Sequence, residues 1–111
     1  MTLPDLTARK CTACQAGAEP LKGDKLREYS LQVPAWDIVG NDHHISRSFK
    51  FKNFAQALEF VNKVGELAEQ EGHHPWIAFT WGIVRIDLWT HKIDGLHESD
   101  FILAAKIDRI E

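Results

Sequence analysis

The sequence predicts an α+β fold, with a four-stranded antiparallel sheet and helices packed on one face. Apolar residues recur at intervals of three and four in residues 53–71 and 98–110, the spacing of helices that bury one side. Residues 36–52 and 77–90 instead resemble pairs of strands, and each stretch contains a glycine at which the chain can turn back. With a short helix in front, the predicted order is helix-strand-strand-helix-strand-strand-helix. Every connection in that order can be a hairpin or a short loop, which favours antiparallel pairing.

Length and composition predict a single folded unit. The chain has 111 residues, of which 44% are hydrophobic, enough for a core that supports itself. Its 13 Lys and Arg against 16 Asp and Glu give a formal net charge of -3 without any basic run, so nucleic acid and membrane surfaces are not expected partners. No stretch is apolar enough to span a membrane, and residues 1–10 lack the pattern of a signal peptide. We therefore expect a soluble, cytoplasmic protein.

Residues 1–20 are predicted to be an N-terminal arm, and residues 21–111 the folded domain. The arm contains Cys11 and Cys14, which are spaced like half of a zinc site. Structural zinc takes four ligands and no second cysteine pair exists, so we expect no bound metal and reduced thiols. Thioredoxin-like redox chemistry is also not expected, because the pair does not follow a strand of a βαβ unit.

The first helix is predicted over residues 23–31, where Asp24 can act as the N-cap and apolar residues fall about one turn apart. Pro34 ends it, because the residue before a proline avoids helical geometry. A hairpin follows, and Phe49 and Phe51 share one face of its second strand. The two strands and the turn between them are predicted at residues 36–39, 43–52 and 40–42.

The second helix is the most strongly patterned element. Asn53 is a good N-cap, Gly72 suits a left-handed C-terminal cap, and Pro75 stops further helix, so the helix should end near Glu71. His73 and His74 then lie just past its end. The predicted buried stripe consists of Phe54, Ala57, Leu58, Val61, Val64 and Ala68.

Residues 77–90 are too long for one strand, and Gly82 offers a break. If the chain folds back there as a tight hairpin, residues equidistant from the turn face each other, and His91 comes alongside His73 and His74. Three imidazoles would then converge at one end of the sheet. The last helix is predicted over residues 98–110, with His97 or Ser99 as its cap.

Histidines are the main functional signal, because six occur and only this side chain titrates unperturbed near neutral pH. Glu69 precedes His73 by four residues, so its carboxylate could orient that imidazole across one helical turn. The alternative is that His73 and His74 only favour the negative end of the helix dipole. The second adjacent pair, His43 and His44, is expected in a turn or at an edge of the sheet.

A set of separated residues matches a known family motif at permitted spacing. The set is Glu69, His73-His74-Pro75, Trp81, His91 and Asp100. In these positions the chain resembles the pterin-4a-carbinolamine dehydratase family. The similarity extends more loosely over residues 21–111, through the order of elements, and leaves residues 1–20 outside.

The resemblance implies an α+β enzyme that forms dimers or tetramers and uses neither a metal nor an organic cofactor. Family members are hydro-lyases that dehydrate 4a-hydroxytetrahydropterins, such as 4a-hydroxytetrahydrobiopterin, which aromatic amino-acid hydroxylases produce, to quinonoid dihydropterins. It implies that His73 and His91 act as general acid and base, that His74 holds the pterin, and that Glu69 supports them. Asp100 matches the last motif position, although a carboxylate there could simply cap the final helix.

One position departs from the family pattern. Trp76 directly follows Pro75, whereas relatives often carry an aromatic residue one position later. Trp76 could replace that ring and stack on the pterin, or it could belong to the core or to an interface.

The alternative to an enzyme is an interaction module, because some relatives of the dehydratases act as dimerisation partners of transcription factors. The intact motif favours the enzyme. The last strand nevertheless exposes more apolar surface on its two faces than one layer of helices covers, so we expect a subunit interface there. One of these faces carries Trp81, Ile83, Arg85, Asp87 and Trp89.

Overall fold

The computed structural model describes residues 6–8 and 19–110. Cys11 and Cys14, on which the zinc and redox alternatives depend, lie outside these residues. The described chain forms η1 (Leu6–Ala8), α1 (Gly23–Leu31), β1 (Asp37–Val39), β2 (His44–Lys50), α2 (Phe54–Glu71), β3 (Trp76–Thr80), β4 (Ile83–Leu88), η2 (His91–Ile93) and α3 (Glu98–Ile107), where η marks a short 3-10 helix.

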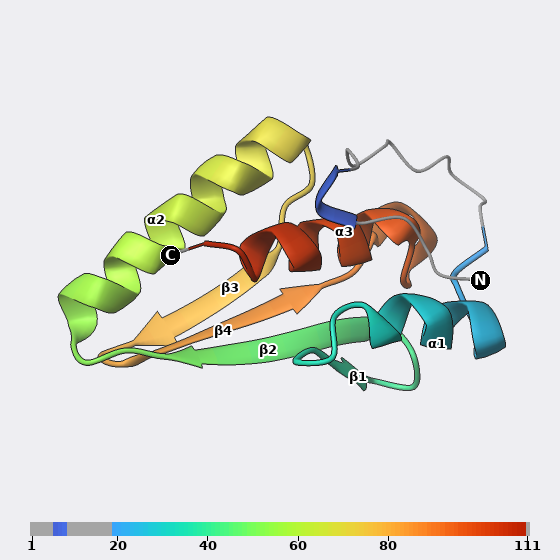
Figure 1. The fold of residues 1–111 in the computed structure, drawn as a ribbon, viewed down its shortest axis with the longest axis horizontal. Coiled ribbons are helices and arrows are strands. Elements are labelled where there is room, and N and C mark those ends of the chain that lie inside the picture. Colours follow the sequence, from blue (N-terminus) through green and yellow to red (C-terminus); the bar gives the residue numbers. More distant parts are fainter. Residues whose placement is uncertain (1–5, 9–18, 111) are drawn as a thin grey trace.

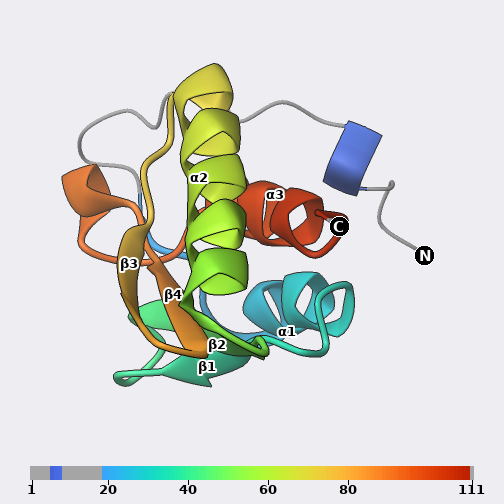
Figure 2. The same cartoon turned by 90° about the vertical axis from the view of Figure 1, so that its left-hand side faces the viewer.

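The four strands form one antiparallel sheet in the order β1-β2-β4-β3 (Figure 1). Helices lie on one side of this sheet, as the view turned by 90° makes clear (Figure 2). The predicted fold class and the order of its helices and strands are therefore confirmed. The two 3-10 helices are additions that the hydrophobic pattern did not indicate.

Helix α2 begins and ends as predicted, because both of its caps are encoded locally. The side chain of Asn53 accepts a hydrogen bond of 2.9 Å from the backbone N–H of Gln56, and Gly72 adopts the left-handed conformation with φ 65°. The predicted stripe is only partly right. Phe60 is buried in the core, whereas Phe54 and Leu58 are 46% and 40% exposed. The buried face is thus rotated towards Ala57, Phe60, Val64 and Ala68.

Helix α1 has the predicted bounds but not the predicted cap. Its N-cap is Lys22, without a side-chain hydrogen bond, and Asp24 lies in the first turn. Asp24 is not the cap because it lies inside the helix, after its first residue, Gly23. A carboxylate in the first turn still complements the helix dipole.

The β1–β2 turn uses a run of left-handed residues, which delays the start of β2, whereas β1 ends at Val39 as predicted. Gly40, Asn41 and Asp42 have φ of 64°, 61° and 66°. The N–H of His43 bonds back to the carbonyls of Val39 and Gly40, so His43 belongs to the turn. Strand β2 accordingly starts at His44.

The chain folds back at Gly82, as predicted. Thr80 pairs with Ile83, which leaves Trp81 and Gly82 as a two-residue turn. A Cβ at Gly82 would lie 2.8 Å from the carbonyl oxygen of Phe51, and the N–H of Phe51 donates to the Gly82 carbonyl. Glycine is required there because the turn contacts the end of β2 directly.

Helix α3 lies in the centre of the core, and its residues Phe101 to Ala104 are fully buried. Leu6 of η1 is 1% exposed and belongs to the same cluster, so the core reaches into the segment predicted as an arm. Within the described residues, no helix is long and apolar enough to cross a membrane.

Candidate active site

His73 is held from the helix side of the sheet. Its Nε2 lies 2.5 Å from Oδ1 of Asp100, a residue in the first turn of α3 that is 0% exposed. The backbone N–H of His73 also bonds to the carbonyl of Ala68, which closes the end of α2. The left-handed turn at Gly72 therefore aims this imidazole at α3, and only 14% of its side chain is exposed.

Asp100 gathers three hydrogen-bond donors in a buried position. Besides His73, the hydroxyl of Thr90 donates to its Oδ2 at 2.9 Å, and so does the backbone N–H of His97, also at 2.9 Å. His97 is the N-cap of α3, so Asp100 completes a capping box. The two roles considered for Asp100, helix cap and partner of the motif histidines, are thus both present in one carboxylate.

The predicted pairing of Glu69 with His73 is wrong. Oε1 of Glu69 instead lies 2.6 Å from Nε2 of His74, and both side chains are more than half exposed. The four-residue spacing applies only while the helix continues, and Gly72 ends it. After Gly72, the side chain of His73 points towards α3, and that of His74 points back to Glu69 in the last turns of α2.

His91 begins η2, directly after strand β4. Its ring contacts that of Trp89, with centroids 4.7 Å apart, and its side chain is exposed. Among the described residues, the His91 side chain has no hydrogen bond or ion pair. The carbonyl of His91 accepts from the N–H of Asp94, which closes the 3-10 turn.

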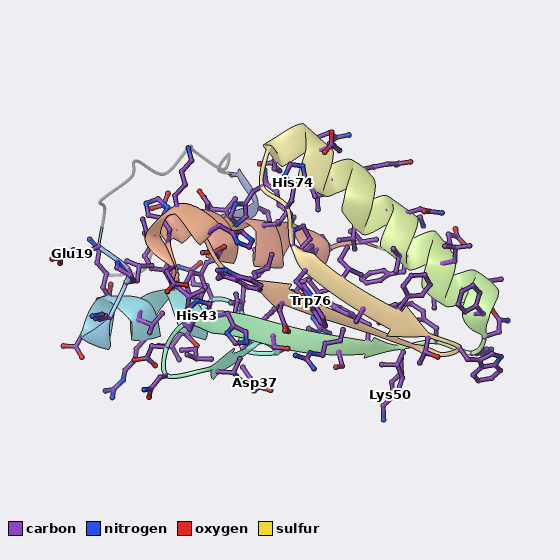
Figure 3. All side chains as sticks on the ribbon, turned by 180° about the vertical axis from the view of Figure 1, so that it is seen from behind. Glu19, Asp37, His43, Lys50, His74 and Trp76 are labelled. Carbon is purple, nitrogen blue, oxygen red and sulfur yellow. The ribbon has the colours of Figure 1, made fainter. Side chains whose placement is uncertain are left out.

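The three motif histidines lie where β3 begins and β4 ends. Trp76 and Asp87 are the last pair of the β3–β4 ladder on this side, and beyond it Thr90 donates a hydrogen bond to the carboxylate that binds His73. The hairpin thus brings the two segments to one edge, although His91 is not bonded to either of the other two imidazoles. Figure 3 shows His74 and Trp76 where the chain leaves α2 and enters β3.

Trp76 does not belong to the core. It is 45% exposed on the sheet face opposite the helices, and the guanidinium of Arg85 lies 5.1 Å from its ring centre. Pro75, half-buried, separates it from His74. The ring therefore follows His74 closely in the chain and is accessible to a substrate or to a partner.

Asp87 is a charged residue that the sequence did not single out for the site. It is 4% exposed although no helix covers its face, and Arg85 donates to it through two nitrogens. Burial raises the pKa of Asp87, but the hydrogen bonds from Arg85 and Ser46 and the positive charge of Arg85 outweigh it and hold the pKa below its usual value. The same bond raises the pKa of Arg85.

Sequence reasoning also missed the contacts of the second histidine pair. Rings of His43 and His44 lie 5.6 and 5.8 Å from that of Trp89, and Nε2 of His43 is 2.7 Å from Oδ1 of Asp94. His43 and Asp94 are far apart in the sequence, so spacing carried no signal. Only the abundance of histidines hinted at a further cluster.

The arrangement suits proton transfer. An ionised carboxylate only accepts hydrogen bonds, so Asp100 favours the tautomer of His73 with the proton on Nε2. Nδ1 of that imidazole is then the nitrogen that can exchange a proton. Glu69 favours the equivalent tautomer of His74. In the described part of the chain, no three His, Cys, Asp or Glu side chains are arranged to hold a metal ion.

Comparison with known proteins places these features in one family. The profile of the family described as "Pterin 4 alpha carbinolamine dehydratase" matches residues 19–110. A protein of Rubrobacter xylanophilus, named provisionally as a pterin-4-alpha-carbinolamine dehydratase, is 52% identical over 97% of this chain and 100% of its own length. One of the same name from Alkaliphilus metalliredigens is 51% identical over 95% of each chain.

Solved structures agree with the sequence relatives. The crystal structure of a protein described as a transcriptional coactivator/pterin dehydratase from Brucella melitensis superposes with a TM-score of 0.75 and 31% identity, over 81% of this chain and 96% of its own. A pterin dehydratase-like protein described as a RuBisCO assembly factor gives a TM-score of 0.58 at 28% identity, over 67% of this chain and 86% of its own.

Proposed function

Because this chain belongs to the pterin-4a-carbinolamine dehydratase family, whose members are hydro-lyases, we propose that it removes water from 4a-hydroxytetrahydropterins to give quinonoid dihydropterins. The observation that carries the proposal is the bond between His73 and the buried Asp100, in a segment of the chain that also carries His74 and the accessible ring of Trp76. A purely structural cap for α3 would not require an imidazole on that carboxylate.

The reaction needs two proton transfers and no electron transfer. The bond between C4a and the hydroxyl oxygen breaks, a proton joins that oxygen to release water, and the ring nitrogen next to C4a loses its proton. The electron pair of that N–H bond forms the new C=N double bond. Histidine can give and take protons near neutral pH, so two imidazoles suffice.

Each histidine has a distinct proposed role. His73 and His91 form the acid–base pair, and Asp100 sets the tautomer of His73. His74, oriented by Glu69, holds the pterin, with Pro75 fixing the direction of the chain. Trp76 is exposed beside His74 and offers a flat ring against the heterocycle. We assign neither the acid nor the base to one histidine.

The chemistry of the substrate defines its source. A 4a-hydroxytetrahydropterin arises when a tetrahydropterin is oxygenated, so we propose that the protein recycles the pterin used by an aromatic amino-acid hydroxylase. The source of substrate is tested by growing cells on the aromatic amino acid that needs hydroxylation. Loss of the protein should then slow growth, and unchanged growth and pterin pools would contradict the link.

Stopped-flow absorbance of freshly generated 4a-hydroxytetrahydropterin tests the activity directly. We expect wild-type protein to accelerate formation of the quinonoid product, and a chelator to leave the rate unchanged. A folded wild-type protein without any effect on the rate would contradict the proposal and favour the interaction module. Inhibition by chelator would contradict the assignment of the chemistry to histidines alone.

We propose further that the protein forms a homodimer or homotetramer through the sheet face opposite the helices. Trp76, Trp81 and Ile83 are 45%, 65% and 45% exposed on or beside that face, whereas monomeric proteins seldom leave large apolar residues grouped in water. Of the other residues in the predicted interface, Asp87 is instead buried within the chain and Trp89 is half-buried.

Replacing Ile83 with Lys is expected to weaken this association, because a charge would enter an apolar contact. Sedimentation velocity at micromolar concentration should show a smaller species for Ile83→Lys than for wild type. Leu31→Lys, which places the same charge at the 79% exposed end of α1, is the matched control and should sediment like wild type. A monomeric wild-type protein would contradict the proposed interface.

A further inference from the structure

Trp89, directly after β4, contacts three imidazoles. The centroid of its ring is 4.7 Å from that of His91, 5.6 Å from that of His43 and 5.8 Å from that of His44. His43 belongs to the turn before β2, and His44 is the first residue of β2 (Figure 3). In the sheet, β2 and β3 lie on opposite sides of β4. The tryptophan thus connects the β1–β2 turn to a motif histidine.

A second contact connects the same two segments. Nε2 of His43 lies 2.7 Å from Oδ1 of Asp94, the residue that ends η2 with φ 50°. The N–H of Asp94 bonds at 3.2 Å to the carbonyl of His91. Asp94 therefore closes the short turn that His91 opens, and its side chain, 90% exposed, contacts His43 from that turn.

Both connected turns have unusual backbone. Asn41, Asp42 and Asp94 are the non-glycine residues with positive φ in the described part of the chain, and all three lie in these turns. At Gly40 a Cβ would come within 2.9 Å of the His44 ring. Such conformations persist where the surrounding contacts hold them, so the contact between the turns is a built feature of the fold.

The imidazole of His91 needs contacts with other residues to keep one orientation. Unlike His73 and His74, it has no carboxylate partner in the described residues, and its side chain is exposed. An exposed imidazole with one ring contact can adopt several rotamers. Proton transfer requires hydrogen-bond distance to the reacting atom, so rotamers that point away from the substrate do not contribute to the rate.

We propose that Trp89, His43 and Asp94 are positioning residues that fix the imidazole of His91 for proton transfer. Trp89 restricts the ring, and the bond between His43 and Asp94 fixes the turn from which the ring extends. The assignment rests on the proposed dehydratase function for its effect on rate, but the placement of the His91 ring can be measured without any substrate.

Trp89→Leu tests the ring contact. We expect the ring-proton NMR signals of His91 to move downfield as the tryptophan ring current is lost, and kcat to fall roughly tenfold with KM within about twofold. Trp89→Phe keeps an aromatic ring and should restore most of kcat. Phe54→Leu also replaces an aromatic ring with Leu, in the contact between Phe54 at the start of α2 and Phe79, and should leave both the signals and kcat unchanged.

Asp94→Gly tests the second contact, because glycine tolerates the left-handed backbone and removes the side chain that bonds to His43. We expect a fall of about threefold in kcat and a shift of the His91 signals, both restored in Asp94→Asn, whose side-chain oxygen still accepts from His43. Unchanged His91 signals in both Trp89→Leu and Asp94→Gly would overturn the proposal. If the signals shift but wild type is inactive on the pterin, the proposed function fails and the positioning stands.

Discussion

His73→Ala is expected to lower the rate of dehydration by a factor of about 100 or more, while the protein stays folded. His73 is one of the two proposed proton-transfer groups, and it alone among the motif histidines is bound to a buried carboxylate. Its side chain is 14% exposed, and its backbone bond to Ala68 does not depend on the imidazole. Stopped-flow rates at saturating pterin, together with circular dichroism, measure both effects.

A second substitution separates proton transfer from hydrogen bonding. In His73→Gln the side-chain amide can still donate to Asp100, but it does not titrate. We expect His73→Gln to be as inactive as His73→Ala and closer to wild type in stability. Unfolding of His73→Ala together with full activity of His73→Gln would contradict a catalytic role and leave His73 a structural partner of α3.

Features that depend on neighbouring residues were predictable from the sequence. Asn53 and Gly72 identify both ends of α2, because each cap acts within one turn of the helix. Gly82 identifies the hairpin turn, and the β-branched and aromatic residues on either side of it indicate β3 and β4. Since the hairpin fixes which residues lie opposite each other, the approach of the histidine segments also followed from local signals.

Contacts that depend on the direction of the chain after a turn were not predictable. The pairing of Glu69 with His74 instead of His73 follows from the left-handed turn at Gly72, which breaks helical spacing. The contact between His43 and Asp94 joins residues from two separate turns, and no spacing rule relates them. The buried face of α2 was misplaced for the related reason that Phe60 contacts Phe49 of β2 and Phe51 just after it, which helical period alone does not indicate.

Asp100 shows why stability and activity cannot be assigned to separate residues in this site. Its carboxylate caps α3 through His97, accepts from Thr90 and binds His73. A family motif and a capping rule both point to this residue, and neither alone describes it. One carboxylate of α3 therefore both stabilises the start of this core helix and orients the proposed catalytic imidazole.

Replacing Asp100 with Ala is expected to lower the free energy of unfolding by roughly 3 kcal/mol, the sum of a lost helix cap and of buried donors left without an acceptor. Chemical denaturation measures this change. Asp24→Ala is the matched control, because Asp24 also lies in the first turn of a helix but caps nothing there. It should cost no more than about 0.5 kcal/mol.

Asp100→Asn distinguishes the two functions of the carboxylate. The amide oxygen can keep the bonds from His97 and Thr90, so the cap survives, but the NH₂ group then faces Nε2 of His73. His73 must accept there and carry its proton on Nδ1, the reverse of the wild-type tautomer. We expect near-native stability with a loss of rate of at least about 100-fold, as for a histidine held in the wrong tautomer. A fully active Asp100→Asn would show that Asp100 only caps α3, and that the imidazole of His73 needs no partner to transfer a proton.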